Sequence, residues 1–257
     1  MTDRKNILQG LEDAEDRIFL SHMLDLKEKS EKTQRIMYSS FLTPGQKILA
    51  EGRLSSLCDM RFSGGFEDAE RVMAAFVPNE WDEEDYPFCG LEIKNLGKRE
   101  LTHRDYLGSI LGLGISRSLV GDIAVSEDGA TVVISRDIAD FILMNLSKVG
   151  SSGVRLGLLE KERVGDIVRN FKVSSVTVSS MRFDCVLSAA TGKSRSAVSS
   201  LISEGIAEVN YTAEKNTSRL IKSGDVISLR GFGKFIAETD LATTKKGRIH
   251  VNIRKYI

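Results

Sequence analysis

The residues with the clearest chemical meaning lie in the last third of the chain, in the run Thr191-Gly192-Lys193-Ser194. Glycine, lysine and serine in this order bind nucleotide phosphates in a P-loop, but a P-loop also needs a glycine five positions before Gly192. Leu187 occupies that position, so the run is not a P-loop. The run still offers a serine that can cap a helix and basic side chains beside the helix start, which together suit phosphate binding.

Further basic residues extend this region into a candidate RNA-binding surface. Arginine pairs with phosphate through two hydrogen bonds and stacks on bases, and lysine supplies a point charge. Serine hydroxyls and free backbone N–H groups at a helix start also reach phosphate. We expect Asp184 to be structural, as a helix cap or as a partner for Arg182. The alternative is a solvated basic face on which Ser194 only caps its helix. The candidate RNA-binding residues are Arg182, Lys193, Ser194, Arg195, Ser196, Ser199, Lys222, Arg230 and Lys234.

No pattern of metal-binding or catalytic side chains accompanies this surface. Zinc sites and disulfide frameworks need histidines and cysteines at short, paired spacings. The histidines and cysteines here are scattered, at His22, His103, His250, Cys58, Cys89 and Cys185. We therefore expect no catalytic residue, no metal and no cofactor. No apolar run approaches the roughly 18–20 residues that cross a membrane, and the first residues lack a signal-peptide core, so we expect a cytoplasmic protein without membrane contact.

The charge distribution separates the two ends of the chain. The 257 residues are 41% hydrophobic and 28% charged with a net charge of zero, which excludes disordered, collagen-like and coiled-coil classes. Residues 1–90 carry 11 basic and 18 acidic residues, whereas residues 180–257 carry 13 basic and 7 acidic ones. Chance clustering is the alternative, but a net charge of +6 at the C-terminal end favours a polyanionic partner there.

The first third has a largely helical pattern. Apolar residues between Ile7 and Leu24 recur every three or four positions, which predicts a helix. After the polar interval KEKSEKTQR we expect a second helical piece near 36–41, and Thr43-Pro44 predicts the start of a helix through about Leu54. Residues 72–77 are a strand or a helix. Trp81 is either an anchor for a partner or a hinge residue that packs against the middle of the chain.

The middle of the chain alternates strands and helices. We expect strands at 91–96, 122–126, 131–135 and 154–159, with helices at 102–113 and 136–146. This order is the ferredoxin-like plan of RNA-recognition motifs. The central strands, IAVS and TVVIS, carry no aromatic residue, so we do not expect this sheet to bind RNA in the usual way.

The last third combines β-branched strands with two short helices. Residues 173–178 predict a strand, 187–190 a helix, and Ser194 the start of a second helix that ends at Gly205. Strands at 206–210, 226–229 and 249–254 complete it, with a turn at Gly224-Asp225. The run RFDCVLSAATGKSRSAVSSLISEGIAEVN, followed by IKSGDVISLRG, resembles the small RNA-binding domain named after ribosomal protein S4. That resemblance implies two helices on a small sheet, with the second helix presenting its N-terminus to RNA. Residues 245–248, Lys-Lys-Gly-Arg, extend this basic surface or form a solvated loop.

A second resemblance runs through nearly the whole chain. The segments FLTPGQ, FSGGFEDAER, GLGISRSLVGDI, DFILMNLSKVG and VISLRGFGKF resemble the bacterial YlmH family. This implies an α+β protein with an N-terminal helical and mixed region (1–86), a ferredoxin-like, RNA-recognition-motif-like middle domain (87–172) and an S4-type RNA-binding domain (173–257).

The YlmH resemblance implies a role in ribosome quality control, on large ribosomal subunits that retain peptidyl-tRNA. We therefore expect a non-catalytic monomer whose partners are rRNA, tRNA and the large subunit. The alternatives are an rRNA-modifying enzyme and a scaffold for cell-division proteins. A pseudouridine synthase would have a catalytic aspartate in an Arg-Leu-Asp run near Thr-Ser-Gly, but Arg182-Phe183-Asp184 lies inside the S4-like segment and no Thr-Ser-Gly follows it.

Overall fold

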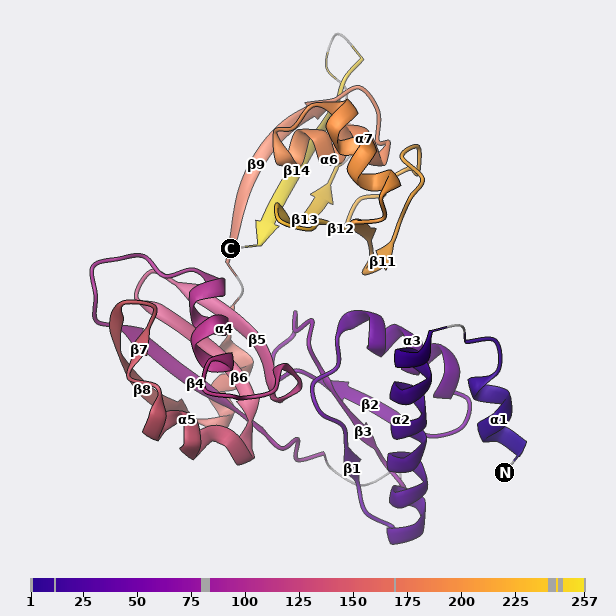
Figure 1. Cartoon of the computed structure of the whole chain (residues 1–257), viewed down its shortest axis with the longest axis vertical. Coiled ribbons are helices and arrows are strands. Elements are labelled where there is room, and N and C mark those ends of the chain that lie inside the picture. The colour runs from indigo at the N-terminus through magenta and orange to yellow at the C-terminus, as the bar shows by residue number, and fades with distance from the viewer. Residues whose placement is uncertain are drawn as a thin grey trace. The chain divides into compact units, whose positions relative to one another are not determined.

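The computed structural model describes residues 2–11, 13–79, 84–168, 170–239, 244 and 247–256. The chain divides into two compact units, residues 1–169 and 170–257 (Figure 1). Both contain helices and antiparallel sheets, which confirms the α+β class. None of the described helices has the length and apolar character needed to cross a membrane. Trp81, Lys245 and Lys246 lie outside the described residues.

The first part of unit 1 packs three helices with a small antiparallel sheet of order β1-β3-β2. Its core includes Leu20, Met23, Leu54 and Phe76, each at most 1% exposed. The elements are α1 (Thr2–Leu8), α2 (Ala14–Thr33), β1 (Met37–Tyr38), α3 (Pro44–Leu54), β2 (Met60–Ser63) and β3 (Met73–Phe76).

Three expectations for this part are wrong and one is confirmed. The apolar pattern between Ile7 and Leu24 belongs to two helices, α1 and α2, instead of one, because Asp13 starts α2 by accepting from the Glu15 N–H at 2.7 Å. The polar interval continues α2 instead of interrupting it, because its lysines and glutamates are good helix formers and Lys27 pairs with Glu31 one turn later at 2.6 Å. The piece near 36–41 contains β1 and no helix, since its backbone pairs with β3. Thr43 does cap α3: its hydroxyl accepts from the Gln46 N–H at 3.2 Å, and its own N–H donates to Gln46 Oε1 at 2.9 Å.

The second part of unit 1 has the predicted order of strands and helices, with one extra short strand. The sheet order β5-β6-β4-β8-β7 places β4, the first strand in sequence, between β6 and β8, and all pairs are antiparallel. The elements are β4 (Phe88–Asn95), α4 (His103–Leu111), η1 (Arg117–Leu119), β5 (Val120–Ser126), β6 (Gly129–Ser135), η2 (Arg136–Ile138), α5 (Ala139–Asn145), β7 (Lys148–Val149), β8 (Ser152–Leu159) and η3 (Lys161–Asp166).

The two parts of unit 1 share a core, although the sequence suggests a domain boundary near residue 86. One face of the larger sheet packs against α4 and α5, where Tyr106 and Ile142 are buried. On the other face, Val133 packs in one cluster with Phe41 and Phe66 of the first part. The first part therefore covers a portion of the face on which RNA-recognition motifs stack bases, and the aromatic residue of β4 on this face, Phe88, packs against Phe41 with ring centroids 6.1 Å apart.

Arg71 links the two parts by hydrogen bonds. Its side chain is buried, and Nε donates to the Val120 carbonyl at 2.9 Å while Nη2 donates to the Phe41 carbonyl at 3.0 Å. In return, Asp122 Oδ2 accepts the Arg71 N–H at 3.1 Å. Burial lowers the pKa of Arg71 to about 10, and the carbonyl partners compensate the desolvated guanidinium.

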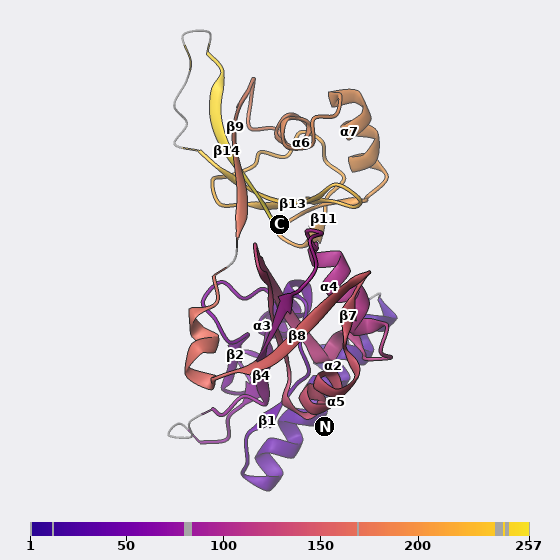
Figure 2. The same cartoon turned by 90° about the vertical axis from the view of Figure 1, so that its left-hand side faces the viewer.

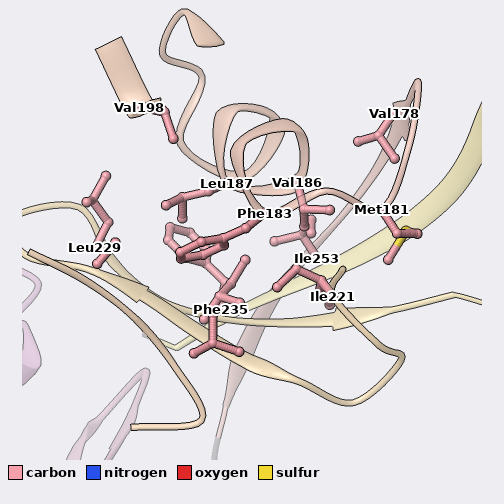
Figure 3. Packing of buried hydrophobic residues seen from close by; sticks show 14 of the residues in the cluster. Val178, Met181, Phe183, Val186, Leu187, Val198, Ile221, Leu229, Phe235 and Ile253 are labelled. Carbon is pink, nitrogen blue, oxygen red and sulfur yellow. The ribbon is translucent and has the colours of Figure 1, made fainter. Parts of the chain in front are cut away.

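Unit 2 is a six-stranded antiparallel sheet of order β11-β10-β12-β13-β14-β9 with two helices on one face (Figure 2). Phe183, Leu187 and Phe235 meet between the helices and the sheet and are buried (Figure 3). The elements are β9 (Phe171–Val178), α6 (Phe183–Thr191), α7 (Arg195–Ser203), β10 (Ala207–Val209), β11 (Thr212–Ala213), β12 (Val226–Leu229), β13 (Gly233–Glu238) and β14 (Ile249–Tyr256).

The predicted elements of unit 2 are present with shifted bounds. Helix α6 begins four residues earlier than the predicted Leu187, because Phe183 and Val186 belong to its buried face. Strand β9 begins at Phe171, which pairs with Tyr256 of β14. The unit therefore begins at residue 170 and not at residue 173.

Candidate RNA-binding surface

The turn between α6 and α7 brings two helix ends together. Gly192 ends α6 with a φ of +71°, a left-handed conformation that glycine adopts without strain. Two residues later Ser194 caps α7, and its Oγ accepts from the Ala197 N–H at 3.3 Å. Between them, the Lys193 carbonyl accepts from Ser188 Oγ at 2.6 Å. These bonds fix the first turn of α7 beside the end of α6.

Asp184 is the centre of an ion-pair network between the two helices. Its carboxylate is 4% exposed and receives a paired interaction from Arg182, with Nε at 3.1 Å and Nη2 at 3.0 Å. Arg195, from the first turn of α7, places both Nε and Nη2 at 2.9 Å from Asp184 Oδ2. The predicted pairing of Asp184 with Arg182 is confirmed, and the bond to Arg195 is an additional contact that the sequence did not indicate.

The network keeps Asp184 charged and orients both arginines. Burial by itself raises the pKa of Asp184, but the hydrogen bonds from Arg182 and Arg195 outweigh it and lower that pKa from 3.8 to about 2. The arginine side chains stay 35% and 51% exposed. A guanidinium has five N–H donors, so each arginine retains donors for an anion while the buried carboxylate holds it in place.

The first turn of α7 adds hydroxyl and backbone donors beside Arg195. Ser196 is exposed and its Oγ lies 3.2 Å from Ser194 Oγ, whereas Ser199 is half-buried one turn further on. The first N–H groups of a helix lack partners within that helix and carry its positive end. Arg182, Ser194, Arg195 and Ser196 thus form one surface, called here the α7 surface, with the chemistry to bind a phosphate group.

Next to the α7 surface, Lys193 contacts the turn between β12 and β13, which contains Arg230. Lys193 Nζ is 4.5 Å from the ring centroid of Phe232, which follows Arg230 in the turn between β12 and β13. Arg230 is exposed, and its N–H donates to the Ile206 carbonyl at 3.3 Å. The sequence did not single out Phe232; an aromatic residue between two glycines, Gly231 and Gly233, is the pattern that could have indicated it.

The two remaining predicted residues lie apart from these. Lys222 is exposed in the loop before β12, and its N–H donates to Asp225 Oδ2 at 2.8 Å. Lys234 follows the alternation of β13: Phe235 and Ala237 face the helices, so Lys234 faces the opposite side of the sheet. The expectation of a single continuous face that includes Lys234 is therefore wrong. Within the described chain, no three His, Cys, Asp or Glu side chains cluster as metal ligands.

Comparisons with known proteins identify relatives along most of the chain. Residues 82–163 match the family described as “Putative RNA-binding domain in YlmH”, which corresponds to the second part of unit 1. The ribosome-associated protein quality control protein P2 of Bacillus subtilis is 27% identical over 246 residues, 94% of this chain and 95% of that protein. A solved structure of the cell division protein ylmH from Streptococcus pneumoniae is similar with a TM-score of 0.50 and 29% identity, covering 59% of this chain and 94% of the other.

Proposed function

Since the chain belongs to the YlmH family, we propose that it is a non-catalytic RNA-binding factor that associates with the ribosome. The observation that carries this proposal is the Arg182–Asp184–Arg195 network, which holds two arginines at the first turn of α7. Recognition by phosphate contacts and shape needs positioned cations and no reacting group. The net charge of +6 over residues 180–257 attracts the same polyanion.

The more specific part of the proposal concerns the target and the type of domain. We infer that unit 2 is an S4-type domain that contacts rRNA and tRNA on large subunits retaining peptidyl-tRNA, in ribosome quality control. The name of the B. subtilis relative supports this role, and the alignment covers almost the full length of both proteins. The two helices on one face of the sheet agree with the S4-like order of residues. Such a factor acts as a monomer in the cytoplasm.

The surroundings of Asp184 support a non-catalytic role. A nucleophilic aspartate of a uridine-modifying enzyme must reach the base, whereas Asp184 is buried and bound by two arginines. A low pKa and two fixed partners suit a structural carboxylate. Conversion of uridine in rRNA by the purified protein would reverse this part of the proposal.

Sedimentation of cell lysate through a sucrose gradient, at low and at high salt, tests the ribosome association. We expect the wild-type chain to migrate with large subunits that hold tRNA and to leave them as salt rises, because phosphate contacts release counterions. A chain that stays at the top of the gradient even at low salt contradicts the proposal. That outcome would favour the alternative of a scaffold for cell-division proteins; the pneumococcal relative is named a cell division protein.

A matched pair of variants tests whether the association depends on Arg195 of the α7 surface together with the neighbouring Arg230. Arg195→Ala with Arg230→Ala removes two charges but leaves Arg182 to pair with Asp184. The control, Arg4→Ala with Arg61→Ala, removes two ion-paired arginines of the N-terminal part. We expect the first variant to leave the subunits at lower salt than the wild type and the control to behave as the wild type. Equal behaviour of both variants would exclude Arg195 and Arg230 from the association.

A further inference from the structure

The sheet of unit 2 has a second face, on the side away from α6 and α7 (Figure 2). Side chains alternate along each strand. Phe235 and Ile253 point into the core beneath the helices, so Lys234 and Arg254 point to the other face. Register places Tyr256 beside Phe171 and Arg254 beside Ile236 on this face.

Three aromatic rings and two cations form a continuous row of contacts on this face. Lys234 Nζ lies 4.9 Å from the ring centroid of Tyr211 and 5.2 Å from that of Tyr256. The Tyr256 ring meets Phe171 edge-on, with centroids 5.0 Å apart and planes at 74°. The Arg254 guanidinium lies over the Phe171 ring, 4.1 Å from its centroid. All five side chains are partly exposed.

A polar groove continues from the row along the same face. It has a volume of about 700 Å³ and is lined by Ser175, Ser223, Gly224, Glu238, Thr239, His250 and Asn252. Ser175 and Asn252 are hydrogen-bonded across the β9–β14 pair. The acidic member, Glu238, is bound by Arg254 at 2.8 Å, which compensates its charge. A groove of this size accepts a nucleotide, and its amide, imidazole and hydroxyl groups can meet base edges.

We propose that this face is a second RNA-binding surface, which holds unpaired nucleobases of single-stranded RNA by stacking. Stacking of bases on aromatic side chains with interleaved cations is the chemistry by which proteins bind single strands. The α7 surface instead offers arginines and helix N–H groups suited to phosphate. This inference rests on the proposed RNA-binding function and adds the class of RNA and a site on the opposite face of the sheet.

Fluorescence of 2-aminopurine tests the stacking directly, because the base is quenched when it stacks on an aromatic ring. The full chain is titrated into a short single-stranded RNA that carries 2-aminopurine, and separately into a double-stranded RNA hairpin. The variants are Tyr256→Leu and, on the edge strand, Phe171→Leu. The control is Phe232→Leu, which removes a ring that also packs on a lysine but on the helix side of the sheet.

We expect quenching with the wild type and with Phe232→Leu. Each of the other two variants is expected to lose most of the quenching and about fivefold to 150-fold in single-strand affinity, the range for one stacked base. Hairpin binding through the α7 surface should be retained, which also shows that the variants are folded. Hairpin binding without quenching by the wild type, or equal quenching by all variants, overturns this inference alone. Loss of quenching in Phe232→Leu as well would assign the base to the helix side. No binding of either RNA by the wild type overturns both this inference and the proposed function.

Discussion

Asp184 and Arg195 lie eleven residues apart on different helices, and both Nε and Nη2 of Arg195 are 2.9 Å from one buried carboxylate oxygen of Asp184. The acid thereby ties the first turn of α7 to the start of α6. The network links the stability of unit 2 to the orientation of its proposed phosphate-binding side chains.

Replacement of Asp184 by asparagine should destabilise the protein in a pH-dependent way. The folded-state pKa of about 2 is below the ordinary value of 3.8, so the carboxylate stabilises the fold above pH 3.8 and loses this effect as pH falls through 2. We expect Asp184→Asn to cost on the order of 1–2 kcal/mol at pH 7, since solvent screens the partly exposed arginines. Urea unfolding at pH 7 and near pH 2 measures the difference. The control, Asp25→Asn, removes an exposed partner of Arg4 and should change little. A cost that is equal at both pH values would contradict the ion-pair account.

Replacement of Arg195 by lysine separates charge from geometry. Lysine retains the positive charge but cannot form the paired contacts of a guanidinium. We expect Arg195→Lys to bind a double-stranded RNA hairpin more weakly than the wild type and more tightly than Arg195→Ala. For Arg195→Ala, the slope of log affinity against log salt should fall by about one, the loss of one phosphate contact. Filter binding over a salt series gives both values, and a slope identical to that of the wild type would remove Arg195 from the contact.

Replacement of Arg71 by leucine should weaken unit 1. The variant leaves the carbonyl of Phe41 without its buried donor, whereas the Val120 carbonyl keeps a bond from Arg117 Nη1. We expect a cost of about 1–3 kcal/mol for the one unsatisfied group. Chemical denaturation followed by circular dichroism measures the loss. Arg53→Leu is a suitable comparison because the bonds of Arg53 to described residues are long, at 3.4 and 3.5 Å, to the carbonyls of Ile7 and Gln9. A smaller loss for Arg71→Leu than for Arg53→Leu would exclude Arg71 as the main link.

Two glycine-to-alanine substitutions should change the stability of the protein in opposite directions. Gly192 has a φ of +71° with no atom near its would-be Cβ, so Gly192→Ala costs about 1–2 kcal/mol through backbone strain alone. Gly108 is exposed inside α4 with equally open space, so Gly108→Ala should stabilise by about 0.5–1 kcal/mol. Thermal unfolding of both variants provides the measurement. Stabilisation by Gly192→Ala would contradict the left-handed end of α6.

The sequence by itself determined the features that depend on neighbouring residues. The capping box at Thr43, the cap at Ser194 and the strand and helix order of residues 88–159 follow from local hydrogen bonding and periodicity. The charge asymmetry and the resemblance to the YlmH family are also contained in the sequence.

Only the tertiary structure decided which distant side chains meet. Two arginines share Asp184 because α6 and α7 pack on one sheet, and Lys234 leaves the predicted surface because strand alternation turns it to the other face. The aromatic row brings together Phe171 of β9, Tyr256 of β14 and Tyr211 of the turn between β10 and β11, which are far apart in sequence. Local patterns fix the φ, ψ and capping of each element, but the burial of apolar faces that brings elements together depends on contacts across the whole chain.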